Sequence, residues 1–148
     1  MLTTNILGKK YEAMACNFLT QKGYKILEQN YSNKIGEIDI ICENNGIMVF
    51  VEVKFRTSAK FGLPLEAITP HKLFKIQNTA LVYLKAHKKL NYPYRIDAIE
   101  ILNDEIRHVE NITNSWFKYD WNKELFCLEF SCLNLIFIKD LNFSLTNK

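Results

Sequence analysis

The sequence of 148 residues has few cysteines, no histidine spacing suited to a metal and no glycine-rich phosphate loop. Its four cysteines form neither a CxxC pair nor the dense framework of a small secreted domain, so we expect reduced thiols. The three histidines are scattered, which argues against a histidine-based metal site. No internal repeat, low-complexity linker or glycine-rich phosphate loop argues for a second domain or a nucleotide cofactor.

Long uncharged hydrophobic runs are also missing. Lysines and a glutamate interrupt anything that resembles a signal peptide near the start. Residues 125–143 are rich in Leu, Phe and Ile, but they include Glu129, Lys139 and Asp140, which argues against a membrane span. We therefore expect a cytoplasmic protein with no membrane segment.

The length suits one core of ordinary size, and the charge is uneven along the chain. Residues 1–119 hold 16 Lys and Arg against 12 Asp and Glu, whereas residues 120–148 hold 3 against 4. This mild basic excess permits nucleic-acid binding without requiring it. We predict a domain over 1–119 and an extension over 120–148, which is an extra strand or helix, a dimerisation element or a poorly ordered tail.

Apolar periodicity and turn residues predict alternating helices and strands, which suggest a mixed sheet covered by helices. A threonine followed by a proline marks the start of the second helix. The predicted elements are helix 3–22, strand 24–29, hairpin 36–56, helix 69–89, strand 92–102 and short strand 106–109.

The hairpin over residues 36–56 organises the chain, because its Asn-Gly pair between two apolar runs is a strong hairpin signal. A two-residue type I′ loop makes opposed residue numbers sum to 91. Asp39 then faces Glu52, and Glu37 faces Lys54. Strand alternation puts these charged residues on one face and an apolar set on the other, which we expect to be the core. That set is Ile38, Ile40, Val49, Val51 and Val53.

Opposed carboxylates have β-carbons about 5 Å apart and repel each other unless something compensates. Mg²⁺ would do so, because it prefers carboxylate oxygens and keeps several waters. Lys54 would reach the same water or a scissile phosphate, so Asp39, Glu52 and Lys54 indicate metal-assisted phosphodiester hydrolysis. Two alternatives stay open: the charges are an ordinary solvated strand face, or a three-residue loop puts Asp39 and Glu52 on opposite faces.

Short motifs in a fixed order run through about the first 110 residues. They are Gly8 with Glu12, Gly23-Tyr24, Gly36 to Ile41, Val49 to Lys54, Phe61-Gly62-x-Pro64-x-Glu66-Ala67, Lys72, Ala80-x-x-Tyr83-Leu84 and Arg95-Ile96-Asp97. Asp39 followed by Glu52-Val53-Lys54 resembles the PD-(D/E)xK nuclease superfamily. The whole set is similar to its YraN branch, a bacterial endonuclease-like family.

The resemblance implies a single restriction-endonuclease-like α/β domain whose mixed sheet has a central hairpin flanked by helices. It also implies an endonuclease that uses Mg²⁺ or Mn²⁺ and acts on DNA, branched or single-stranded. Asp39, Glu52 and the Val53 carbonyl would hold the metal, and Lys54 would orient water or stabilise the transition state. Glu12, in the first helix, would add a contact to the site; as an alternative, it is only a solvated helix flank.

Three basic residues are candidates for nucleic-acid contact. Lys72 matches a position of the family near the start of the second helix, and Lys75 follows one turn later. Arg56 ends the hairpin beside the active face. Ordinary surface polarity is the alternative for such residues. Asp97 shares a strand face with Arg95, and we favour a structural ion pair over a metal ligand.

Two other functions remain open. One is a nucleic-acid-binding module that keeps the fold without catalysis. The other is a protein-interaction scaffold, in which residues 120–148 hold a protein partner or a second copy in a homodimer. Fold resemblance alone does not decide among the three.

Overall fold

The computed structural model describes residues 4–56 and 68–113. By its internal contacts the chain divides into Met1–Ser115 and Trp116–Lys148, and every described residue lies in the first unit. The predicted boundary after residue 119 and the predicted extension lie outside the described residues. The elements are α1 (Thr4–Gln21), β1 (Lys25–Ser32), β2 (Glu37–Asn44), β3 (Ile47–Arg56), α2 (Pro70–Ala86), β4 (Tyr94–Leu102) and β5 (Glu105–Val109).

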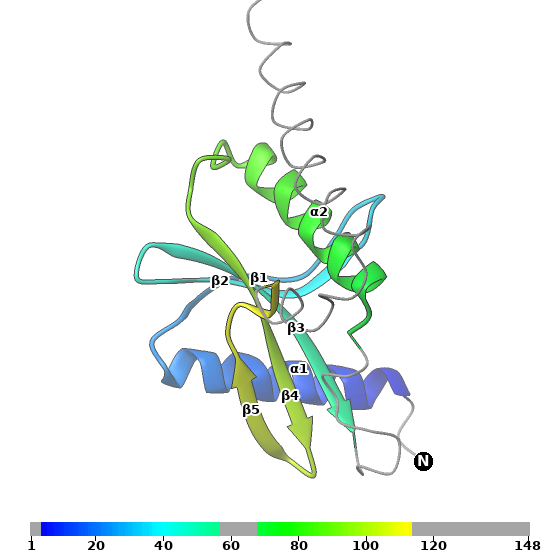
Figure 1. The fold of residues 1–148 in the computed structure, drawn as a ribbon. Coiled ribbons are helices and arrows are strands. Elements are labelled where there is room, and N and C mark those ends of the chain that lie inside the picture. Colours follow the sequence, from blue (N-terminus) through cyan, green and yellow to red (C-terminus); the bar gives the residue numbers. More distant parts are fainter. Residues whose placement is uncertain (1–3, 57–67, 114–148) are drawn as a thin grey trace, which may run out of the picture. The chain divides into compact units, whose positions relative to one another are not determined.

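The strands form one mixed sheet in the order β1-β2-β3-β4-β5 (Figure 1). The pairs β1–β2, β2–β3 and β4–β5 are antiparallel, whereas β3 and β4 run parallel. A parallel pair needs a long crossover, and the chain between β3 and β4 carries α2. The predicted mixed α/β fold with a central hairpin and flanking helices is confirmed.

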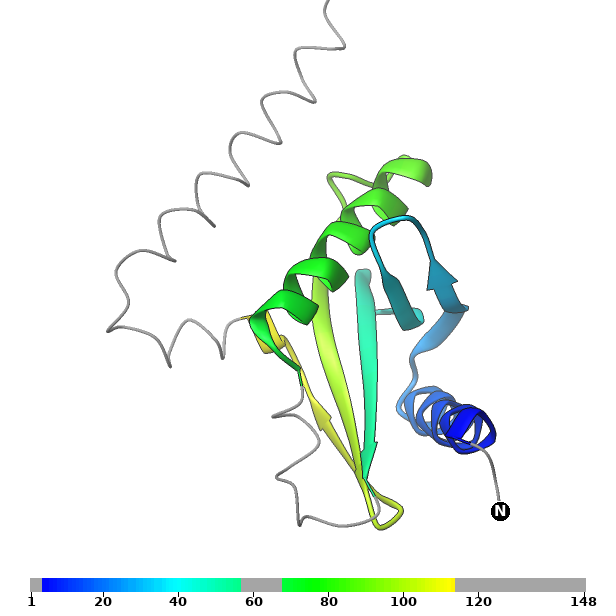
Figure 2. The same ribbon diagram turned by 90° about the vertical axis from the view of Figure 1, so that its right-hand side faces the viewer.

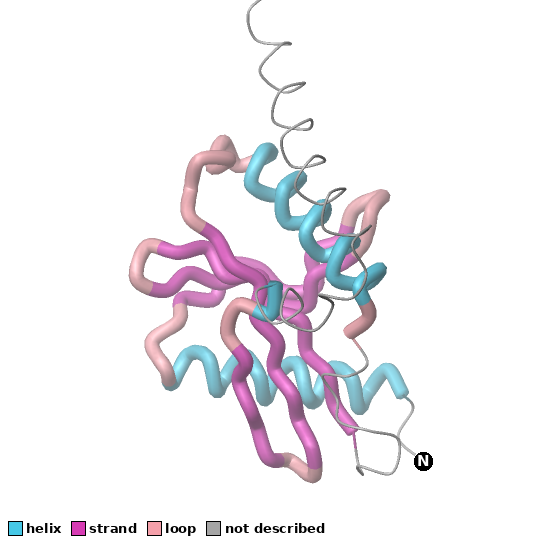
Figure 3. The backbone as a smooth tube through the Cα atoms, viewed as in Figure 1, coloured by secondary structure: helices cyan, strands magenta, loops and turns pink. Residues whose placement is uncertain are grey.

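Both faces of the sheet are covered, α1 packing on one and α2 on the other (Figures 2 and 3). Two separate apolar clusters result. The α2 cluster includes Ile38, Ile41, Met48, Phe50, Ile76, Tyr83, Leu84 and Ile96. The α1 cluster includes Tyr11, Ala15, Leu19, Ile40, Val49, Val51, Val53 and Ile99.

The hairpin register is confirmed. The β2–β3 ladder runs from Asn44 opposite Ile47 to Ile40 opposite Val51, and each pair sums to 91. The loop residues Asn45 and Gly46 have φ angles of 50° and 74°, the positive values that a type I′ turn requires.

The expectation of one core face was wrong in two respects. The second face of the hairpin is also buried, because α2 covers Phe50 and Ile41 there. Ile38 belongs to the α2 cluster, whereas Ile40 belongs to the α1 cluster. The β2–β3 ladder ends at Ile40, so β3 no longer fixes the direction of side chains before that residue.

A local sequence signal sets the start of α2. The Thr69 side chain accepts a hydrogen bond from the Lys72 backbone N–H, at 3.2 Å, and caps α2 as predicted. α2 ends at Ala86, about three residues before the predicted end, and Lys88 beyond it has a φ of 57°. In the described residues, neither helix is long and apolar enough to cross a membrane.

Candidate active site

The site forms where β2 and β3 separate. After the last ladder pair, Ile40 with Val51, the Asp39 carboxylate accepts a hydrogen bond from the Val53 backbone N–H, with an Oδ2···N distance of 2.7 Å. A side chain therefore satisfies a backbone donor that the ladder no longer pairs. This bond fixes the Asp39 carboxylate next to residues 52 and 54 of β3.

Glu52 is the most unusual residue of the site, because its side chain is a carboxylate yet only 1% exposed. Its Oε1 lies 2.6 Å from the Nζ of Lys54 and 3.3 Å from the Nζ of Lys72. Its Oε2 is buried and has no hydrogen-bond partner among the described residues. A buried carboxylate oxygen without a partner is costly, so this oxygen is suited to an additional ligand.

The electrostatics of Asp39 point the same way. Burial raises the pKa of Asp39 to about 6, and the nearby Glu52 carboxylate adds to the rise. The Val53 N–H and the ammonium groups of Lys54 and Lys72 act in the opposite direction without cancelling it. The Asp39 carboxyl therefore resists ionisation, and a cation bound beside it would favour its charged form.

Lys72 enters the site from the first turn of α2. Its Nζ contacts Glu52 Oε1 at 3.3 Å and Glu37 Oε1 at 3.6 Å. Burial lowers the pKa of Lys72, but the carboxylates of Glu52, Asp39 and Glu37 outweigh burial, so the pKa is raised. Glu37 thus pairs with Lys72, whereas the opposition predicted for Glu37 placed it against Lys54.

The remaining predicted site residues lie differently. Glu12 is on α1, and the charged side chains that shift the pKa of Asp39 are those of Glu52, Lys54 and Lys72, without Glu12. Instead, Glu12 adds to the effect of burial in raising the pKa of the Cys16 thiol. No hydrogen bond or ion pair among the described residues joins Glu12 to Asp39 or Glu52, and its contact with the site stays a prediction.

No ion pair among the described residues joins Arg56 or Lys75 to the carboxylates. Arg56 is the last residue of β3, and its Nε is buried with no hydrogen-bond partner among the described residues. Lys75 is exposed one turn after Lys72, close to Gly36, where an added Cβ would lie 3.5 Å from the Lys75 Cβ. The turn before β2 and the start of α2 thus approach each other beside the cluster.

The donor set fits a hard divalent cation. Asp39 and Glu52 supply carboxylate oxygens, and the Val53 carbonyl remains a predicted further ligand. Within residues 4–56 and 68–113, no cluster of three or more His, Cys, Asp or Glu side chains forms a complete metal cage. Mg²⁺ commonly binds through one or two carboxylates and keeps waters or substrate oxygens in its other positions, so two carboxylates suffice.

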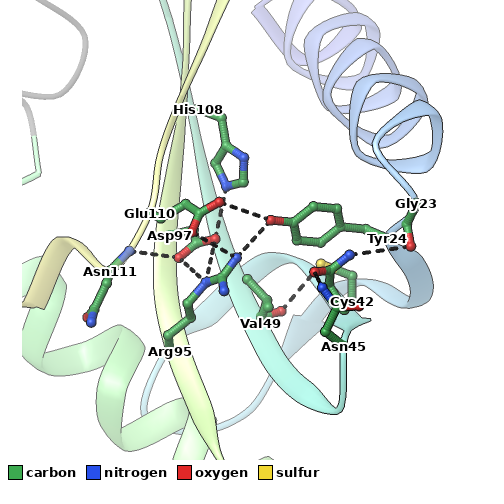
Figure 4. Close-up of polar contacts among 11 residues, drawn as sticks. Gly23, Tyr24, Cys42, Asn45, Val49, Arg95, Asp97, His108, Glu110 and Asn111 are labelled. Atoms are coloured by element: carbon green, nitrogen blue, oxygen red, sulfur yellow. Dashed lines mark hydrogen bonds and ion pairs between the residues drawn. The ribbon is translucent and has the colours of Figure 1, made fainter.

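A second polar cluster lies around Asp97, on β4 (Figure 4). The Asp97 carboxylate accepts from Arg95 Nε at 3.0 and 3.1 Å and from the Asn111 N–H at 2.8 Å, and it lies 2.9 Å from His108 Nε2. Arg95 also donates to the Tyr24 hydroxyl, at 2.7 Å. The predicted Arg95–Asp97 ion pair is confirmed.

The sequence interpretation missed His108, to which it assigned no role. The Asn103-Asp104 pair is a turn signal in the sequence from which the position of His108 could have been predicted. In the structure these two residues have φ angles of 50° and 64°. That turn pairs Ile99 with His108 in the β4–β5 ladder, so His108 lies diagonal to Asp97. Because Asp97 is fully buried and has several donors, this cluster ties the fold together and leaves no open ligand position among the described residues.

A mixed sheet between two helices, with paired carboxylates and lysines where a central hairpin opens, is compatible with a nuclease-like α/β fold. A family model described as "Uncharacterised protein family UPF0102" matches residues 11–101. The chain belongs to this family, the YraN family, which is part of the restriction-endonuclease-like superfamily.

Two relatives match this chain at about the same sequence identity. A UPF0102 protein of Fusobacterium nucleatum is 41% identical over 111 residues, which cover 75% of this chain and 93% of the relative. One from Lachnoclostridium phytofermentans is 40% identical over 116 residues, 78% of this chain and 98% of the relative. The relatives are thus matched almost whole, whereas about a quarter of this chain lies outside the matches.

A solved structure entitled "Crystal structure of SSO0001" has a TM-score of 0.41 and 19% identity, and the match covers 73% of this chain and 52% of the other. A likeness of this extent supports no conclusion about this chain.

Proposed function

We propose that this protein is a nuclease that depends on a divalent cation, Mg²⁺ or Mn²⁺, and hydrolyses phosphodiester bonds in DNA. The observation that carries the proposal is the Glu52 carboxylate, which is almost fully buried, has one oxygen without a partner among the described residues and lies beside a second carboxylate of raised pKa. Buried positions in a sheet are normally apolar, so a carboxylate at such a position indicates a ligand-binding role.

The side chains divide the work by chemistry. Asp39 and Glu52 would bind the cation, which when bound shields developing charge on a phosphate and makes an attacking water more acidic. The Val53 N–H holds Asp39 in a fixed orientation through its hydrogen bond. An active site requires such a fixed orientation, because misplacing a catalytic group lowers the reaction rate by a large factor.

The charges of the two lysines balance those of the two carboxylates. Once a cation engages the carboxylates, Lys54 and Lys72 are left to contact an anionic substrate. The Lys54 side chain is 31% exposed and that of Lys72 is 26% exposed. Both side chains are therefore partly accessible to solvent, although the carboxylate they pair with is buried. Lys54 would then orient the attacking water or stabilise charge on the phosphate, and Lys72 would help to bind the phosphate.

Cleavage of end-labelled duplex, single-stranded and branched DNA tests the proposal with either cation. We expect Asp39→Asn and Lys54→Ala each to lower the cleavage rate by about 100-fold or more, because each removes a group that acts at the reacting phosphate. Circular dichroism checks that both variants keep the wild-type fold.

Matched controls come from exposed positions on other elements. Asp104→Asn removes a carboxylate whose side chain is 62% exposed, and Lys25→Ala removes an exposed ammonium from β1. Both are expected to cleave like the wild type. Unchanged cleavage by Asp39→Asn and Lys54→Ala would refute the proposal.

A second candidate is a nucleic-acid-binding module that does not cleave. It is favoured by the charge balance of the site, since Glu52 Oε1 contacts both lysines. DNA binding without cleavage by the wild type, with either cation, would support this candidate. The scaffold alternative, with a protein partner or a homodimer, depends on residues 120–148, which lie outside the described residues.

A further inference from the structure

The charged side chains between residues 68 and 95 are all basic. This stretch contains five lysines and one arginine but no aspartate or glutamate, whereas the chain's average of 16 acidic residues in 148 would place about three in such a stretch. α2 forms most of this stretch, so its charge is of a single sign.

The fold separates the two sides of α2. Its inward side packs against the sheet through residues that include Leu73, Ile76, Ala80, Tyr83 and Leu84. Lys75 and Lys85 are exposed on the helix, and Lys88 is exposed directly after it. The lysines therefore project into solvent from an element whose other side is fixed.

Acidic groups lie only at the flanks of this surface, as far as the described contacts show. Glu37 pairs with Lys72 at the start of the helix. Glu28 and Glu43 act on the pKa of Tyr83 and Tyr92, on the side where β1 and β2 lie. None of these contacts involves Lys75, Lys85 or Lys88.

The cationic surface is continuous with the candidate active site. Lys72, in the first turn of α2, contacts Glu52 directly. From Lys72 to Lys85 the helix advances about 20 Å at 1.5 Å per residue, which equals about six base pairs of duplex DNA at 3.4 Å each. An open hollow of about 390 Å³, lined by Lys88, Lys89, Leu90, Asn91 and Tyr92, lies at the far end.

We propose that the outer side of α2, defined by Lys75, Lys85 and Lys88, binds one phosphate backbone of a DNA duplex and leads it from the carboxylate pair to this hollow. The proposal deepens the nuclease function and rests on it for the location of the reacting phosphate. The occupant is assigned by charge complementarity and by continuity with Lys72. At the far end Lys89 Nζ lies 4.9 Å from the centre of the Tyr92 ring, so the hollow presents a further ammonium.

The test is the salt dependence of binding to a duplex of about 20 base pairs, measured by fluorescence anisotropy with EDTA from about 50 to about 200 mM salt. We expect the double variant Lys75→Gln/Lys85→Gln to bind on the order of tenfold more weakly than the wild type, with a salt slope smaller by about two. Lys75→Arg/Lys85→Arg keeps both charges and is expected to bind like the wild type.

The control removes the same charge elsewhere. Lys9→Gln/Lys25→Gln changes two exposed lysines on α1 and β1, and we expect it to keep the wild-type slope and affinity. The proposal is overturned if this control loses as much as the α2 variant. It is also overturned if the α2 variant binds normally, or if the wild type shows no salt-dependent duplex binding.

Binding and cleavage separate the two proposals. Loss of binding confined to the α2 variant, in a protein that never cleaves DNA with either cation, would refute the nuclease and retain the phosphate-binding surface. Cleavage that depends on Asp39, together with unchanged binding by the α2 variant, would do the reverse.

Discussion

Asp39 is held between opposing influences. Its carboxylate accepts a backbone hydrogen bond and faces two lysines, which favour the charged form, but burial and the Glu52 carboxylate prevail. The pKa of about 6 therefore lies above the ordinary value of 3.8. A buried carboxyl that resists ionisation costs folding free energy once it must ionise, and this cost is measurable without any substrate.

The first prediction at this scale concerns pH and stability without metal. Between pH 3.8 and about 6 the folded protein keeps a proton on Asp39 that the unfolded chain has released. Its contribution to stability is full below pH 3.8 and is lost as the pH rises through 6, about 3 kcal/mol in all.

Urea unfolding at a series of pH values, in EDTA, measures this contribution by comparing the wild type with Asp39→Asn. The amide cannot ionise, so the difference between the two free energies of unfolding should change with pH over that range. A constant difference from pH 4 to pH 7 would contradict the raised pKa. Asp104→Asn, at an exposed position, serves as the control.

Lys72 shows that a side chain of the site can come from an element far from the hairpin in sequence. It is one of two lysines on the same carboxylate oxygen, yet it comes from a different element than Lys54. The Thr69 cap fixes the first turn of α2 and thereby the direction of the Lys72 side chain. A local capping signal thus contributes to the geometry of the site.

At the scale of the element, the Asp97 cluster ties the β4–β5 hairpin to Tyr24, the residue before β1. Arg95 links the Asp97 carboxylate to the Tyr24 hydroxyl, and Tyr24 donates to Glu110 at 3.3 Å (Figure 4). His108, whose side chain is 3% exposed, packs its ring edge against Tyr24 with ring centres 5.6 Å apart. Polar contacts here connect segments that are distant in sequence.

We expect Asp97→Asn to lower the free energy of unfolding by about 3 kcal/mol, because it removes a fully buried negative charge that pairs with the half-buried Arg95 guanidinium. Chemical denaturation measures the change. Asp104→Asn is the matched control and should change stability by less than about 0.5 kcal/mol, since surface pairs contribute little.

The interpretation of Asp97 as structural also predicts its effect on cleavage. At a temperature where Asp97→Asn is folded, its cleavage rate should stay close to that of the wild type, because no hydrogen bond or ion pair among the described residues joins Asp97 to the Glu52 cluster. A loss of activity as large as that of Asp39→Asn, in a folded variant, would instead favour a direct role for Asp97.

At the scale of the whole molecule, both apolar clusters and the candidate site are built from residues of the first unit, Met1–Ser115. The family match, residues 11–101, lies inside the same unit. The alignments cover almost the full length of these relatives but leave out about a quarter of this chain. Most of the described sheet therefore lies in the part of the chain that the family model matches.

We expect the chain truncated after Ser115 to fold and to unfold cooperatively, because it retains every strand and both helices of the described sheet. Thermal unfolding followed by circular dichroism tests this. Truncation after Leu102 is the comparison; it removes β5 and His108 and should abolish cooperative unfolding. Loss of the transition in the longer of the two truncated chains would show that residues 116–148 are part of the folding unit.

The sequence by itself determined the features that depend on neighbours along the chain. An Asn-Gly turn fixed the hairpin register, since a two-residue loop allows only one pairing, and so brought Asp39 toward Glu52. Threonine followed by proline fixed the start of α2, because the cap and the restricted φ act within one turn. Arg95 and Asp97 lie two residues apart on one strand face, which was enough to predict their ion pair.

Only the tertiary structure decided which surfaces are buried and which distant side chains meet. The crossover through α2 covers the second face of the hairpin and brings Lys72 to Glu52, and the start of β1 brings Tyr24 to Arg95. The position of Ile38 in the α2 cluster also follows from packing. The physical reason is that strand alternation assigns a residue to a face, whereas the elements packed on that face decide its burial and its partners.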